Sequence, residues 1–133
     1  QGSAEPIEFE IYYREKSNDA PITYELSIGL DKNSRPIVEK ERLRQRRQKE
    51  RYGRPMSFLF LEHGKGYAFK GINSGFLEEE NKEVGDKVDV ELVDPRQLGI
   101  VTLGELKEHP RIVKFKNFLK QMERLHTQTY GIQ

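Results

Sequence analysis

Strict alternation of apolar and polar residues is the feature that most constrains the fold of this chain. In the run from Pro6 to Arg14, Ile7, Phe9, Ile11 and Tyr13 fall on one face. The run "ITYELSIGL" alternates in the same way. A period of two predicts strands with one buried face, and the polar stretch "KSNDAP" between the runs predicts an antiparallel hairpin.

Four further stretches complete the expected sheet of about six strands. The segment from Ile37 to Gln45 places Ile37, Glu39, Glu41, Leu43 and Gln45 on one face, which favours a charged edge strand over a helix with a poor apolar stripe. A basic turn follows it. "MSFLFLE" is expected to be covered on both faces, with "GYAFKG" as its hairpin partner and a last strand in "GDKVDVELVD".

The hydrophobic period then changes from two to between three and four. Thr102 and Glu105 have the spacing of a capping box, which predicts a helix start. Pro110 interrupts, and a second helix is expected from about Arg111, with an apolar stripe and a basic remainder. The stripe consists of Ile112, Phe115, Phe118, Leu119, Met122 and Leu125. Strands followed by helices indicate an α+β fold, an antiparallel sheet with C-terminal helices.

The length of 133 residues predicts one domain, and 35% hydrophobic against 34% charged residues predicts a thin core. We expect residues 1–3 to be a tag remnant and residues 4–133 to form the domain, with a β region at 4–95 and a helical region at 98–130. No apolar run is long enough for a bilayer, the start does not resemble a signal peptide, and there is no cysteine. These features predict a cytoplasmic location without a membrane partner.

The segment "HGKGYAFKG" raises the question of a phosphate-binding loop. Gly66 and Gly71 have the required spacing, but Ile72 and Asn73 follow where Lys and Ser or Thr are needed. We therefore interpret these glycines as hairpin residues that supply positive φ angles.

No other catalytic or metal-binding pattern emerges from the sequence. There is no serine between glycines and no cysteine, and the three histidines, His63, His109 and His126, lack ligand spacing. The carboxylates of "EEE" at 78–80 lie in a polar stretch and are interpreted as a solvated charge run. We predict no catalytic residues and no metal site.

Charge is segregated along the chain although the formal net charge is only +1. Residues 78–94 carry a net charge of −6, and residues 39–54 carry +5. The basic block could neutralise phosphates of a nucleic acid, or it could be a solvated strand edge. Its candidate nucleic-acid residues are Arg42, Arg44, Arg46, Arg47, Lys49, Arg51 and Arg54.

The stretch "DPRQLGIVTLGELKEHPRIVKFKNFL" resembles a region of P-loop ATPases of the RecF/SMC-like, ABC-type class, often described as AAA family ATPases. The resemblance rests on three short motifs and the aromatic positions that follow them. It extends more loosely upstream to about Glu5. The matching residues are Arg96-Gln97-Leu98, Thr102-Leu103-Gly104, His109-Pro110-Arg111, Phe115 and Asn117-Phe118-Leu119.

This resemblance implies an internal piece of an ATPase head, the antiparallel β-subdomain and the start of the helical subdomain. The phosphate loop (Walker A) would lie upstream, and the signature and Walker B acid downstream. ATP and magnesium would then bind the intact parent rather than this chain alone, and the rest of the head would be its partner. The resemblance also suggests a homodimer of the parent and contact with DNA.

One residue departs from the family pattern and is the candidate cofactor-binding residue. Glu105 follows "TLG" where the family has Gln, a position similar to the Q-loop that senses magnesium and the γ-phosphate. The alternative is that Glu105 only closes the capping box with Thr102.

Two other functions remain open. The basic block could make the chain a nucleic-acid-binding module, or the apolar stripe of the second helix could make it a protein-interaction domain.

Overall fold

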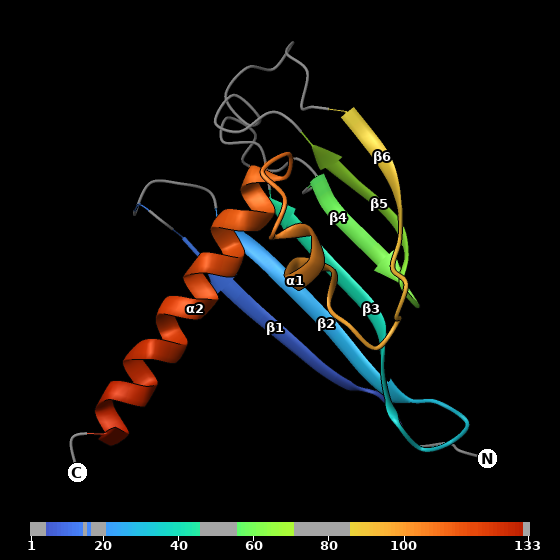
Figure 1. Ribbon diagram of the computed structural model, residues 1–133, viewed down its shortest axis with the longest axis horizontal. Helices are drawn as coiled ribbons and strands as arrows, with labels where there is room; N and C mark the ends of the chain where they lie inside the picture. Colours follow the sequence, from blue (N-terminus) through green and yellow to red (C-terminus); the bar gives the residue numbers. More distant parts are fainter. Residues whose placement is uncertain (1–4, 15, 17–20, 46–55, 71–85, 132–133) are drawn as a thin grey trace.

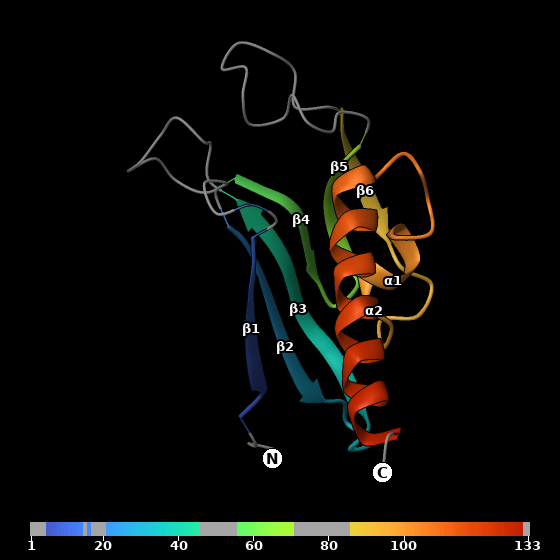
Figure 2. The ribbon, with the colours of Figure 1, turned by 90° about the vertical axis from the view of Figure 1, so that its left-hand side faces the viewer.

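The computed structural model describes residues 5–14, 16, 21–45, 56–70 and 86–131, which form one antiparallel sheet with two helices on one of its faces (Figure 1, Figure 2). The strands pair in chain order, so each strand contacts its sequence neighbours. The strands are β1 (Ile7–Tyr13), β2 (Ile22–Leu30), β3 (Pro36–Gln45), β4 (Met56–Glu62), β5 (Lys65–Lys70) and β6 (Asp86–Glu91). The helices are α1 (Gly99–Leu103) and α2 (Pro110–Gly131). The predicted α+β class is confirmed.

The expected edge position of β3 is wrong. β3 lies between β2 and β4, and the edges of the sheet are β1 and β6. Its charges are compatible with a central position because they divide between the two faces. Glu41 is buried on the helix side, whereas Arg42 and Arg44 point to the other face and meet glutamates there.

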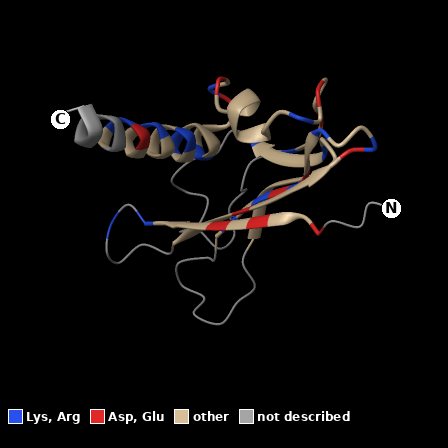
Figure 3. Ribbon diagram, turned by 90° about the horizontal axis from the view of Figure 1, so that it is seen from below, with Lys and Arg blue, Asp and Glu red and all other residues tan. Residues whose placement is uncertain are grey.

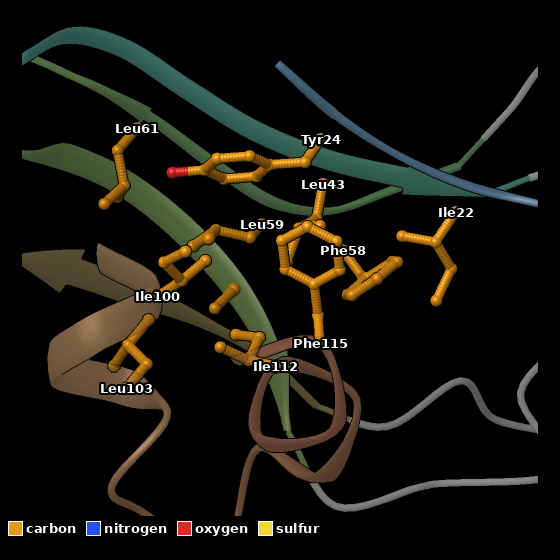
Figure 4. Packing of buried hydrophobic residues seen from close by; sticks show 11 residues of the cluster. Ile22, Tyr24, Leu43, Phe58, Leu59, Leu61, Ile100, Leu103, Ile112 and Phe115 are labelled. Carbon is orange, nitrogen blue, oxygen red and sulfur yellow. The ribbon is translucent and has the colours of Figure 1, made fainter. Parts of the chain in front are cut away.

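The core lies between the helix-side face of the sheet and the two helices (Figure 4). In the central register, Ile11, Tyr24, Leu43, Leu59 and Ala68 follow one another across five strands. The last four of these residues are buried. This row explains why the apolar positions of separate alternating runs form one continuous surface.

α2 covers this surface with the N-terminal part of its apolar stripe. Ile112 and Phe115 are fully buried, and the ring of Phe115 lies 5.1 Å from that of Tyr24. Phe118 packs on Tyr13 at a ring distance of 4.1 Å. Further along the helix, Met122 is 52% exposed. The stripe is therefore used over its first half.

In the described part of the chain, helices cover β4 on one face only, whereas cover on both faces was expected. A register shift between Leu43 and Arg44 allows both Phe58 and Leu59 to be buried. Phe60 points to the other face, where its ring lies 6.0 Å from that of Tyr67 and 5.9 Å from the guanidinium of Arg42.

The predicted capping box does not form. α1 already begins at Gly99, its N-cap is Leu98 without a side-chain bond, and Thr102 lies inside the helix. The second helix begins within one residue of the predicted start, at Pro110. Pro is favourable there because the first helical N–H groups have no partner within the helix.

None of the helices in the described part of the chain is long and apolar enough to cross a membrane.

Candidate functional site

The most unusual polar group in the structure is the buried carboxylate of Glu41. Its side chain is fully buried, and it accepts three hydrogen bonds. The backbone N–H of Gly99 donates at 2.5 Å, that of Ile100 at 2.9 Å and the Tyr24 hydroxyl at 2.9 Å. Glu41 thereby caps α1 from a strand almost 60 positions earlier in the chain and joins the helical part to the sheet.

The titration of this cluster is governed by burial. Burial raises the pKa of Glu41, and its three hydrogen bonds oppose that effect only partly. Burial, followed by the neighbouring charge of Glu41, also raises the pKa of Tyr24, which therefore stays a hydrogen-bond donor. No cation contributes to either shift. The arrangement is suited to holding α1 in place, and the carboxylate has little access to a substrate because it is fully buried.

The candidate cofactor residue Glu105 lies just after the C-cap of α1 and forms an ion pair with Lys116 of α2. Its side chain is 66% exposed, whereas that of Lys116 is 11% exposed. The hydrogen bond from Lys116 and its positive charge lower the pKa of Glu105. Since the capping box is absent, Glu105 has a different structural role: it links the segment after α1 to α2.

The motif residues of the resemblance gather at the junction of the sheet and the helices. Arg96 pairs with Asp94 before α1, and Leu103 is buried at its end. A Cβ at Gly104 would lie 2.3 Å from the Ile100 carbonyl oxygen, so a side chain there would force α1 to shift. His109 precedes α2 and is only 4% exposed. These residues build the joint between the two parts of the fold.

His109 carries an unsatisfied ring atom at this junction. Its Nδ1 is buried without a hydrogen-bond partner among the described residues. Burial lowers its pKa, and a hydrogen bond with the backbone of Phe69 opposes this effect. A neutral ring is therefore favoured, and its free Nδ1 is an acceptor.

Two of the candidate nucleic-acid residues, Arg42 and Arg44, are described, and both form ion pairs with Glu25 on the face of the sheet away from the helices. Figure 3 shows acidic and basic positions together on the strands. Arg44 lies 3.0 Å from Glu25 and 3.6 Å from Glu10. Arg42 donates to Ser57 at 2.7 Å and lies 3.6 Å from Glu25. The remaining candidates lie outside the described residues: Arg46, Arg47, Lys49, Arg51 and Arg54. The carboxylates of 78–80 also lie outside them.

A shallow depression of about 370 Å³ on the sheet is lined by three glutamates and one lysine, with Phe9, Leu26 and Ser27. The charged residues are Glu8, Glu10, Glu25 and Lys40. Its carboxylates would repel the phosphates of a nucleotide. The described residues hold no group of three or more potential metal ligands.

The segment that resembles a phosphate loop is a hairpin connection. His63 and Gly64 join β4 to β5 and have φ angles of 51° and 80°. Two successive positive φ angles are typical of a tight type I′ turn. The prediction of a positive φ angle is confirmed at Gly64. It does not extend to Gly66, a β5 residue packed against the Phe60 carbonyl.

Sequence reasoning missed the part played by Glu41, Tyr24 and Lys116. A signal for Glu41 was present, because a period of two places it on the same face as Leu43. Nothing in the local sequence identifies the N–H groups of Gly99 and Ile100 as its partners.

Comparison with known proteins finds no matching family model, no similar curated protein and no similar solved structure. The family resemblance therefore remains a prediction from the motifs.

Proposed function

We propose that this chain is part of the head domain of an ABC-type, RecF-like ATPase, where it forms the antiparallel β-subdomain and the start of the helical subdomain. ATP binding and hydrolysis belong to the intact parent protein. Magnesium and ATP would be its cofactors, and the remainder of the head would be the partner of this chain.

The observation that carries the proposal is the place of the motifs in the fold. The first motif ends at the N-cap of α1, the second forms the end of α1 and its C-cap, and the third leads into α2, so all three lie where the sheet passes into the helices. That is the position the resemblance implies, between a β-subdomain and a helical subdomain. Leu103, Gly104 and His109 are buried at this joint, and their packing gives a physical reason for these motif positions.

The hairpin at His63 and Gly64 also supports a non-catalytic role for this chain alone. In a phosphate loop, successive backbone N–H groups surround the phosphates before a helix. Here strand β5 follows the turn at once, and the N–H of His63 already donates to the Glu39 carbonyl at 3.0 Å.

Titration with a fluorescent ATP analogue and magnesium tests whether this chain alone binds ATP. We expect no saturable binding to this chain at nucleotide concentrations of about 1 mM, a free energy of about −4 kcal/mol. Binding at about 1 μM would contradict the proposal. In the parent gene, a phosphate loop is expected upstream of this segment, and its absence there would refute the ATPase assignment.

A further inference from the structure

Within the described residues, the edge strand β1 and the segment 121–125 of α2 each expose apolar side chains. On the helix-side face of the sheet, Ile7 is 61% exposed and Phe9 is 48% exposed. On α2, Met122 is 52% exposed and Leu125 is 60% exposed. The exposed apolar residues of β1 and those of α2 therefore form two separate surfaces, and neither surface covers the other.

The course of α2 relates these two surfaces. Figure 1 shows α2 crossing the sheet near the C-terminal end of β1 and continuing past the free edge of that strand. The crossing point is fixed by Phe118, which packs on Tyr13. From Phe118 to Leu125 the helix advances about 10 Å, which equals about two strand spacings. Two more strands would fit beneath this overhang.

We propose that a second copy of this chain fills the space, with the β1 strands of the two copies paired antiparallel about a two-fold axis at Ile11. The sheet would then continue from one copy into the other. This interface does not depend on the proposed ATPase function.

Continued one residue past the end of β1, to Arg14, this register places opposite charges across from each other. Pairing about Ile11 sets Glu8 of one copy opposite Arg14 of the other, and it sets Glu10 opposite Tyr12. Glu8, Tyr12 and Arg14 are all exposed. Opposite charges that face each other across two strands stabilise their pairing. In the alternative register with the two-fold axis at Phe9, Glu8 would instead face Glu10. Because of the two-fold symmetry, each of these contacts occurs twice in the dimer.

The same register brings the two apolar surfaces together. Phe9 of one copy lies opposite Tyr13 of the other, so the overhanging α2 of the second copy passes above Phe9. The next residue inward across the sheet is Leu26, the partner of Phe9 in β2. Met122 and Leu125 would cover these side chains reciprocally. The two α2 helices would cross the sheet about four residues apart, a separation of about 13 Å that leaves room for both.

Sedimentation equilibrium of the full chain, from about 1 μM to about 1 mM, tests the proposal. We expect a concentration-dependent rise from the chain mass of 15.6 kDa to twice that value. Glu8→Arg and Arg14→Glu should each weaken the dimer by about tenfold or more, because like charges then face each other twice. The double variant should restore it. Glu62→Arg, on an exposed glutamate three strands away, is the matched control and should have no effect.

Met122→Glu tests the helical contact separately and should also weaken the dimer; circular dichroism reports whether this variant folds. If Met122→Glu does not fold, the Glu8→Arg and Arg14→Glu variants and their combination still test the dimer. A chain that stays monomeric over the whole range overturns the proposal, and so does a dimer that Glu8→Arg leaves unchanged. Failure of the double variant to recover dimerisation would exclude the register.

Discussion

Replacement of Glu41 by Ala should be among the most damaging single changes in the described part of the chain. The carboxylate accepts bonds from two N–H groups at the start of α1 and from the Tyr24 hydroxyl. The first N–H groups of a helix have no partner within the helix. Because Gly99 and Ile100 are buried, water does not readily take the place of the carboxylate. Alanine would leave three donors without an acceptor.

The cost follows from these three bonds. A lost bond that leaves a buried donor unsatisfied costs about 1–3 kcal/mol. Three such losses would exceed 3 kcal/mol, and relief of the buried charge offsets part of that sum. We expect a loss of about 3 kcal/mol in the free energy of unfolding, or roughly 10 °C in the melting temperature. Glu41→Gln keeps one acceptor oxygen and should cost only about 1 kcal/mol at neutral pH.

The pH dependence provides a second readout. Burial raises the pKa of Glu41 in the folded state above its ordinary value of 4.5. Between these two pKa values the folded state binds more protons than the unfolded state, so stability falls as pH rises. This contribution is fully present below pH 4.5 and is lost as pH rises through the folded pKa. The gap in unfolding free energy between the native chain and Glu41→Gln should therefore narrow from pH 4.5 upward.

Urea unfolding followed by circular dichroism measures both effects, with Glu62→Ala as the control. Glu62 is an exposed glutamate of the neighbouring strand and should change stability by less than about 0.5 kcal/mol. If Glu41→Ala were within about 1 kcal/mol of the native chain, the capping role would be refuted. A gap that widens with rising pH would contradict the argument that burial dominates the pKa.

Two glycine substitutions and one turn substitution extend the test by the same urea assay. Gly66→Ala should cost about 3 kcal/mol or more, because a Cβ would lie 1.9 Å from the Phe60 carbonyl oxygen. Gly29→Ala should cost less than about 1 kcal/mol, since its Cβ meets only the carboxylate end of Glu39, which can rotate away; equal losses at both positions would contradict the steric reasoning. His63→Asn should stabilise the fold by about 0.5 kcal/mol because Asn tolerates the φ angle of 51° better, and a loss of stability would oppose the turn assignment.

Much of the sheet could be predicted because alternation is a local signal. β1, β2 and β3 each carry their own period of two in the sequence, and short turns favour antiparallel neighbours. The same signal cannot say which strand lies at the edge, because edge and central strands can share the alternation. Arg42 and Arg44 suggested an edge, yet their charges are paired with glutamates of β2 and β1.

The sheet-to-helix junction could not be predicted in the same way, because its contacts join residues distant in the chain. The spacing of Thr102 and Glu105 fits a capping box, but the carboxylate that caps α1 is Glu41, from a strand. Glu105 instead pairs with Lys116. The start of α1 is therefore capped by a buried acceptor from a distant strand and not by the local capping-box motif.

The ion pairs of β3 also determine how the nucleic-acid hypothesis should be tested. Arg44→Ala would leave Glu25 and Glu10 without this cation, so weaker heparin binding in that variant would partly reflect newly unpaired carboxylates. The sharper test changes Arg46 and Arg47 to Ala together. If the block contacts phosphates, the salt concentration needed for elution should fall, and the salt dependence of DNA affinity should decrease by about 0.9 for each lost contact. Unchanged elution of this variant would count against nucleic-acid binding by the block.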